Sequence, residues 1–237
     1  MSHFAVAVFH EEDQDIDDLL APYSENLEVE PYIAYTKEQA IRHCKEHWRD
    51  EYTAGKSDEE LWKALAMEYN NNTDKEGNIY STYNPDSKWD WYQVGGRWSG
   101  HLKLKPSCEY ECADEAYVHE VDFSDDLEEY LYALRFWDVV VDGKPQKDGE
   151  EIFSFYGPKY YLDYYGDRET YARRVSQWIV RAVVTPDGVW HEKGEMGWFG
   201  CSSESPEEAG DWDDHFKERF IDTADPDWVI TIVDCHI

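Results

Sequence analysis

The chain has 237 residues, of which 41% are hydrophobic and 16% aromatic. This composition excludes a wholly disordered chain, because disordered sequences lack the aromatic side chains that build a core, and the length suits one large domain or two small ones. With 53 acidic and 22 basic residues, the formal net charge is −31, which argues against direct binding to nucleic acid or to an anionic membrane.

The sequence also bears on where the protein acts. No stretch approaches the roughly 18 apolar residues of a membrane-spanning helix, and the start, MSHFAVAVFHEED, lacks the basic segment and long apolar run of a secretion signal. We therefore expect a cytoplasmic protein whose five cysteines are reduced. Cys108 and Cys112 are spaced like half of a zinc site, but no second pair follows, so we expect neither a metal nor a cofactor.

The first half of the chain predicts one strand and two helices. Residues 3–9 alternate and are rich in β-formers, which is typical of a strand. Helices are expected at 36–52 and 57–69, because each stretch starts with a capping box and continues with one apolar face. In the first helix the box consists of Thr36 and Gln39.

The middle of the chain predicts a strand at 99–105 and a helix at 124–137 with Ser124 as its N-cap. Residues 138–146 are rich in valine and end in an Asp-Gly turn, so we expect a strand there, with residues 151–157 returning against it.

The last third predicts a short helix at 167–178 and a hairpin at 178–192, folded around the turn sequence Thr-Pro-Asp-Gly. Residues 205–224 begin with a serine cap followed by proline and acidic residues, which indicates another helix start. The final stretch, 227–237, is nearly all apolar and predicts a strand.

Strands at both ends with helices between them predict one α+β domain over residues 1–237. We expect a mixed, mainly antiparallel sheet that contains both terminal strands, with several helices packed on it. Because the terminal strands are nearly all apolar, they are expected side by side in the middle of the sheet. That pairing would bring His3 near Asp234 or His236.

The most distinctive stretch is NPDSKWDWYQVGGRWSG, residues 84–100. Its two adjacent glycines permit positive φ angles or a close backbone approach. The arginine that follows can pair with a nearby aspartate, stack on an indole ring or clamp an anion. The stretch is therefore either an aromatic mini-core organised by an Arg–Asp pair or an anchor for a ligand or partner. The candidate anchor residues are Trp89, Asp90, Trp91, Arg97 and Trp98.

A second candidate cluster combines WHEKGEMGWFGCSS, residues 190–203, with the C-terminal DCHI. Its side chains could build a metal site or a Cys–His nucleophile pair. The alternative is a tryptophan-rich loop that closes one end of the sheet, with the C-terminal cysteine buried. Neither cluster matches a known catalytic motif, so no catalytic residue is assigned. The residues of this second cluster are His191, Glu195, Trp198, Cys201, Asp234, Cys235 and His236.

Acidic residues gather at 10–18, 124–129 and 207–216. Their spacing does not fit a calcium-binding EF-hand. They form either solvated surfaces that keep the protein soluble or a negative face that imitates the phosphate backbone of a nucleic acid. The predicted acidic face consists of Asp125, Asp126, Glu128, Glu129, Glu207, Glu208, Asp211, Asp213 and Asp214.

Five segments of the chain resemble a family of bacteriophage and prophage proteins: MSHFAVAV, LLAPYSENLEVEPY, YNPDSKWDWYQVGGRWSG, WHEKGEMGWFG and VDCHI. The resemblance brings no established activity and assigns no catalytic residue. It implies a phage accessory protein that acts in the cytoplasm of a bacterial host. Small acidic proteins in that setting often inhibit host defence, and some of them are DNA mimics.

Charge and resemblance together predict a non-enzymatic binding protein. It would inhibit a host nucleic-acid-handling or defence complex by binding its basic surface, as an anti-CRISPR protein or a DNA mimic does. One alternative is an enzyme or small-ligand protein that holds a nucleotide-like molecule between tryptophans and Arg97. Another is a structural or regulatory phage protein. A continuous acidic face would favour inhibition, whereas evenly spread acids with a deep aromatic pocket would favour a small ligand.

Overall fold

The computed structural model describes residues 2–195 and 202–237. The chain forms two compact units, unit 1 (Met1–Pro22 and Lys88–Ile237) and unit 2 (Tyr23–Ser87). Two residues of the second candidate cluster, Trp198 and Cys201, lie outside the described ranges. That the whole chain is one domain stays a prediction.

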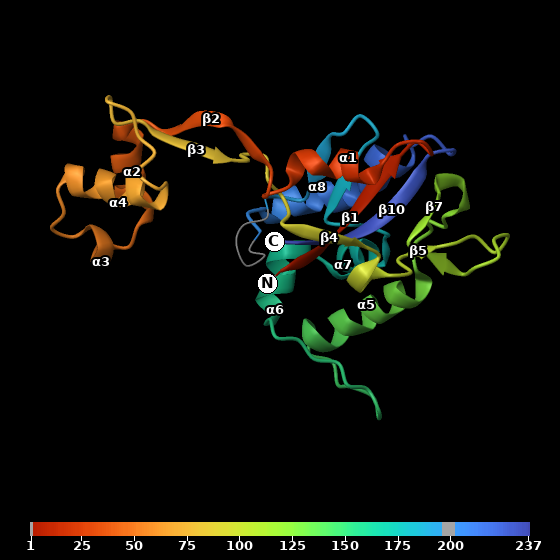
Figure 1. Ribbon diagram of the computed structural model, residues 1–237. Helices are drawn as coiled ribbons and strands as arrows, with labels where there is room; N and C mark the ends of the chain where they lie inside the picture. Colours follow the sequence, from red (N-terminus) through yellow and green to blue (C-terminus); the bar gives the residue numbers. More distant parts are fainter. Residues whose placement is uncertain (1, 196–201) are drawn as a thin grey trace. The chain divides into compact units, whose positions relative to one another are not determined.

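Unit 1 is built on a sheet with the strand order β4-β10-β1-β8-β9, in which β7 also pairs with β10. Strands β1 and β10 run antiparallel along their whole length and lie in the middle of the sheet (Figure 1). The pairing of β1 with β8 is parallel, and the others are antiparallel. The predicted α+β class, with both terminal strands in a mixed, mainly antiparallel sheet, is therefore confirmed. The strands are β1 (His3–His10), β4 (Trp91–Val94), β7 (Glu115–Tyr117), β8 (Ala182–Val184), β9 (Trp190–Glu192) and β10 (Val229–His236), beside a separate pair of β5 (Leu102–Lys103) and β6 (Cys112–Ala113).

The two central strands are apolar on both sides because both faces of the sheet are covered. Alternate residues of β1 point to opposite faces. Ala5, Ala7 and Phe9 pack with Trp212 and Phe216 of α8, whereas the residues between them pack on the other face with Leu20 of α1. The α-helices of unit 1 are α1 (Ile16–Leu20), α5 (Leu127–Val140), α6 (Pro158–Tyr165), α7 (Arg168–Ser176) and α8 (Pro206–Phe216). A π-helical segment, η5 (Lys217–Ile221), follows α8, and the 3-10 turns are η2 (Gly96–Trp98), η3 (Val118–Glu120) and η1 (Ala21–Tyr23), which leads into unit 2.

Helices α5, α6 and α7 share a further core of aromatic side chains, including Phe136, Trp137, Tyr161 and Tyr171. This core explains why α5 is longer than its sequence predicts. The valines after Trp137 were expected to begin a strand, but α5 continues to Val140, because these side chains pack into the same core. The predicted strands at 138–146 and 151–157 are therefore wrong.

Two smaller predictions also need correction. The N-cap of α5 is Asp126 rather than Ser124, since the Asp126 carboxylate accepts hydrogen bonds from the backbone N–H groups of Glu128 and Glu129. The strand expected at 99–105 is reduced to the two residues of β5. By contrast, the hairpin of β8 and β9, the start of α8 after its serine cap and the final strand are confirmed.

Unit 2 consists of a two-stranded sheet and three helices. Both predicted capping boxes are present at the starts of α2 and α4. The two helices pack through Cys44 on one and Leu61 and Leu65 on the other, with Ile79 in the same core. The elements are β2 (Glu28–Tyr35), α2 (Lys37–His47), α3 (Asp50–Thr53), α4 (Asp58–Glu68) and β3 (Ile79–Tyr83). In neither unit do the described residues include a helix with the length and apolarity that membrane crossing requires.

Candidate functional site

The distinctive tryptophan stretch forms strand β4 and then the tight turn η2. Gly95 and Gly96 have φ angles of +69° and +56°, in the left-handed region that favours glycine. A Cβ atom on Gly96 would lie 2.4 Å from the Cβ of Asp234, and one on Gly95 would lie 2.3 Å from Oδ2 of Asp114. The two glycines are therefore required for the turn to approach these carboxylates closely.

The turn directs a backbone donor, rather than the arginine side chain, at the buried acid. The N–H of Arg97 donates to Oδ2 of Asp234 over 3.0 Å. The Arg97 side chain is exposed and forms no ion pair with any residue in the described ranges. The Arg–Asp pair considered from the sequence is not formed, because Asp90 pairs with His236 instead.

Two histidine–aspartate pairs meet where β1, β10 and β4 lie side by side. Nδ1 of His3 is 2.8 Å from Oδ1 of Asp234, and Nδ1 of His236 is 2.7 Å from Oδ1 of Asp90. His3 and His236 are direct partners across the two central strands, and their ring centroids are 5.0 Å apart. The expectation that His3 lies beside Asp234 or His236 is confirmed. We call His3, Asp90, Trp91, Asp234 and His236 the terminal histidine cluster.

Trp91 covers both imidazoles of this cluster. Its ring stacks on His236 at 5.1 Å with an interplanar angle of 15°, and it meets His3 edge-on at 5.4 Å. Asp234 and His236 are 3% and 5% exposed, whereas Trp91 is 43% exposed. The cluster is therefore closed on its inner side and bounded by an indole that reaches the surface.

The hydrogen bonds of the cluster decide its chemistry. A carboxylate only accepts, so each Nδ1 carries the hydrogen and donates it. Nε2 of His236 is then left open, and it is buried without a partner among residues 2–195 and 202–237. Histidines that bind metals or act as general bases often have this arrangement, in which Nδ1 donates to a carboxylate and Nε2 is free to accept.

The other residues around the cluster have structural roles. Trp89 packs into the α1-side core and donates from Nε1 to the carbonyl of Leu20, while Trp98 packs against the α8-side core. Cys235 points to the face opposite its two neighbours, and burial raises the pKa of its thiol far above the ordinary value. The thiol therefore stays protonated and is a poor nucleophile.

The second candidate cluster does not assemble as one site. Two strands, β8 and β1, lie between β9, which carries His191, and β10. In register, His191 is paired with Val183 of β8, Val183 with Ala7 of β1, and Ala7 with Ile232 of β10. Three strand spacings, roughly 14 Å, therefore separate His191 from the strand that carries the C-terminal Asp-Cys-His.

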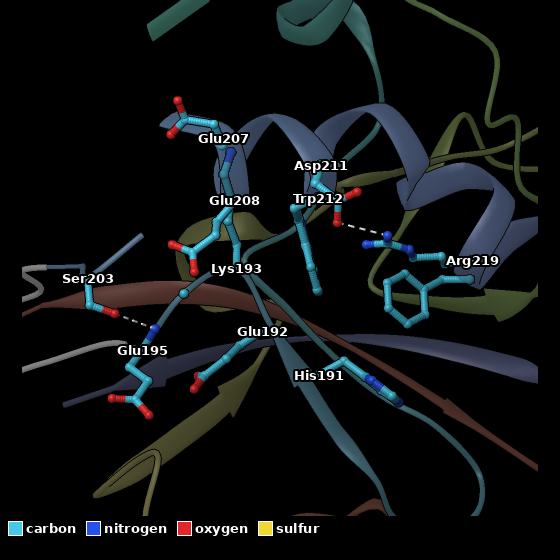
Figure 2. Close-up of a pocket in the computed structure, with 12 residues that line it drawn as sticks. His191, Glu192, Lys193, Glu195, Ser203, Glu207, Glu208, Asp211, Trp212 and Arg219 are labelled. Carbon is cyan, nitrogen blue, oxygen red and sulfur yellow. Dashed lines mark hydrogen bonds and ion pairs between the residues drawn. The ribbon is translucent and has the colours of Figure 1, made fainter. Parts of the chain in front are cut away.

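His191 and Glu195 instead line a cavity of about 930 Å³ between β9 and α8. Figure 2 shows acidic side chains along this cavity together with the ring of Trp212, and Phe220 also lines it. The lysine and the arginine of the lining both form ion pairs within the protein: Lys193 with Asp213 at 2.6 Å and Arg219 with Asp211 at 2.8 Å. The lining residues are His191, Glu192, Lys193, Gly194, Glu195, Ser203, Glu207, Glu208, Asp211, Trp212, Arg219 and Phe220.

Most acids of α8 are held in internal contacts. Asp214 pairs with both Arg173 and Arg174 at 2.8 Å, and the adjacent Arg174 guanidinium helps to hold the Asp214 pKa at about 2. Asp213 is 6% exposed, and its burial raises the pKa of the carboxyl group despite the nearby Lys193. Glu208 closes a capping box with Ser205, and Glu207 is exposed.

The acids at the start of α5 are placed differently. Asp125, Glu128 and Glu129 are exposed. Asp126 caps the helix and pairs with Lys103 at 3.2 Å. The predicted acidic face thus divides into exposed carboxylates on α5 and largely neutralised ones on α8.

A third group of acids lies between β1 and the end of α1. All six are exposed, and no basic side chain in the described part of the chain forms an ion pair with any of them. The Tyr117 hydroxyl donates a hydrogen bond to Glu12, and the negative charges of Glu120 and Asp227 further raise the Tyr117 pKa. We call Glu11, Glu12, Asp13, Asp15, Asp17 and Asp18 the α1 acidic segment. Its signal in the sequence was the run HEEDQDIDD.

Comparisons with protein families, with curated proteins and with solved structures find no match to this chain. The assignment of a function therefore depends on the side chains themselves.

Proposed function

We propose that the protein binds a basic surface of a host nucleic-acid-handling or defence complex and inhibits it, as an anti-CRISPR protein or a DNA mimic does. The observation that carries this proposal is the α1 acidic segment. It places six exposed carboxylates within residues 11–18, without a basic partner anywhere in the described ranges.

Such a segment favours a cationic partner because its own fold does not neutralise it. Four of its six acids precede helix α1, and Asp17 and Asp18 lie in its first turn. The charges of duplex DNA also lie close together, recurring about every 1.7 Å along the axis. The segment concentrates six exposed carboxylates within eight residues, and this local negative charge is the property it would share with a duplex.

The charge of the whole chain supports the same partner. At −31 it attracts basic proteins over several ångströms and accelerates their association. The resemblance to phage and prophage proteins supports the cytoplasm of a bacterial host as the place of action, and defence complexes that bind nucleic acid carry basic surfaces there.

The test is retention of host proteins by the immobilised protein at low salt, followed by elution at high salt and identification by mass. The key variant carries Glu11→Gln, Asp13→Asn and Asp18→Asn. The matched control carries Glu25→Gln, Glu28→Gln and Glu30→Gln, which removes the same charge from exposed positions of unit 2.

We expect a basic nucleic-acid-binding protein that is retained by the wild type and the control, is released by salt and is lost from the variant. Its purified complex should lose activity when the wild-type protein is added. Equal retention by all three proteins would contradict a role for the α1 acidic segment. Retention of no basic protein would overturn the proposal and favour the alternative of a nucleotide-like ligand near Trp91 and Arg97.

A further inference from the structure

We propose that His3 and His236 bind one divalent transition-metal ion of the zinc class through their Nε2 atoms. Asp234 and Asp90 hold the two imidazoles from behind. This site is separate from the α1 acidic segment and goes beyond the binding of a basic protein.

The backbone places the two histidines at the closest kind of cross-strand position. Ser2 and Ile237 exchange both of their backbone hydrogen bonds, so the next residues, His3 and His236, form a pair without backbone hydrogen bonds between them. Side chains approach most closely at such pairs. The centroid distance of 5.0 Å fits two imidazoles on one ion, because a Zn–N bond of about 2.0 Å and a tetrahedral angle place the centroids roughly 5 Å apart.

The carboxylates have the role expected of residues behind metal ligands. Metal-binding histidines usually donate their other ring N–H to a carboxylate, which fixes the ring and makes the ligand nitrogen more basic. Both histidines here show this contact, at 2.8 and 2.7 Å. Asp234 is itself fixed by the N–H of Arg97, so the turn that contains the two glycines supports the site.

The open nitrogen of His236 is the observation that points to a ligand. Nearly all buried polar atoms of folded proteins have a partner, yet Nε2 of this 5% exposed residue has none within residues 2–195 and 202–237. A bound cation would satisfy it, and the two adjacent carboxylates would favour the positive charge.

The site has two protein ligands. No group of three or more histidine, cysteine or acidic side chains in the described ranges is arranged to hold a metal. The two histidines would therefore be the protein ligands of the ion within these ranges.

The chain also contains a natural control. His43 and His47 lie one turn apart on α2, with ring centroids 4.8 Å apart, and no carboxylate is hydrogen-bonded to either ring among the described residues. Without such a carboxylate the rings of this pair are not fixed and the ligand nitrogens are not made more basic. The proposal predicts that the pair held by carboxylates is the tighter site.

The experiment is calorimetric titration of the full chain with Zn²⁺, without a polyhistidine tag and with excess Mg²⁺ to occupy surface carboxylates. All proteins carry Cys108→Ser, Cys112→Ser and Cys201→Ser so that these thiols do not compete. We expect one ion per chain, at least tenfold weaker binding after His3→Ala or His236→Ala, and less than a twofold change after the pair His43→Ala and His47→Ala.

Asp90→Asn keeps both ligands and distinguishes loss of the site from loss of the fold. It should weaken zinc binding about tenfold, with an unchanged circular dichroism spectrum. The proposal is overturned if the wild type binds no zinc, if the His43 and His47 variant loses the binding, or if Asp90→Asn and the folded His3→Ala variant bind as tightly as the wild type.

Discussion

Helix α8 and the α1 acidic segment are both dominated by acidic residues in the sequence, but the fold treats them in opposite ways. On α8, Asp211, Asp213 and Asp214 each contact a cationic side chain from elsewhere in unit 1. The α1 acidic segment has no such contact in the described part of the chain. The difference shows that the fold neutralises the acids of α8 internally and leaves the α1 acidic segment exposed, without a cationic partner in the described ranges.

The sharpest way to test this comparison is Asp213→Ala. The change leaves the ammonium group of Lys193 without its partner, and the Lys193 side chain is only 17% exposed. Removing one member of a buried pair typically costs about 3 kcal/mol or more, so we expect unfolding free energy to fall by about 3 kcal/mol in urea denaturation.

The double variant Asp213→Ala with Lys193→Met is the control, because no charge is then left buried. It should recover more than half of the loss. If the single and double variants were equally unstable, the effect would come from packing and not from charge.

Asp214→Asn should have a smaller effect that depends on pH. The folded pKa of about 2 lies below the ordinary 3.8, so the pair stabilises the fold above pH 3.8 and this contribution disappears as the pH falls towards 2. Because a third of the Asp214 side chain is exposed, we expect only about 1 kcal/mol at pH 7. Thermal melts of wild type and variant should differ at pH 7 and converge near pH 2. A difference independent of pH would contradict the ion-pair explanation.

Neutralising the α1 acidic segment should change stability least. With Glu11→Gln, Asp13→Asn and Asp18→Asn, no ion pair is lost and some repulsion is relieved, so unfolding free energy should stay within about 0.5 kcal/mol of the wild type. Urea denaturation of this variant checks the expectation. A loss above 1 kcal/mol would mean that these carboxylates serve the fold after all.

Much of the fold could be predicted because its signals are local. Capping boxes, the Thr-Pro-Asp-Gly turn and the apolar terminal strands each depend on a few neighbouring residues. The end of α5 could not be predicted this way. Valines favour strands by propensity, but here the aromatic core of α5, α6 and α7 keeps Val139 and Val140 helical.

The candidate site could be predicted only where it depends on local signals. The pairing of the terminal strands follows from their composition, and it placed His3 beside Asp234. That Asp90 would pair with His236 instead of Arg97 depends on the register of β4 against β10, which nothing near Asp90 encodes. Likewise, the arginines that neutralise Asp214 lie 40 and 41 residues away.

The central pairing of β1 with β10 has a consequence for the order of events during synthesis. His3 and Asp234 are 231 positions apart, so β1 leaves the ribosome long before its main partner exists. Unit 2, by contrast, is one uninterrupted segment, Tyr23–Ser87, whose strand pairing begins at Glu28 and ends at Tyr83. Contacts between distant residues form slowly, whereas local ones form early. Unit 2 can therefore take shape on the nascent chain while the apolar strand β1 is still without β10, and in that interval its apolar side chains lack their final cover.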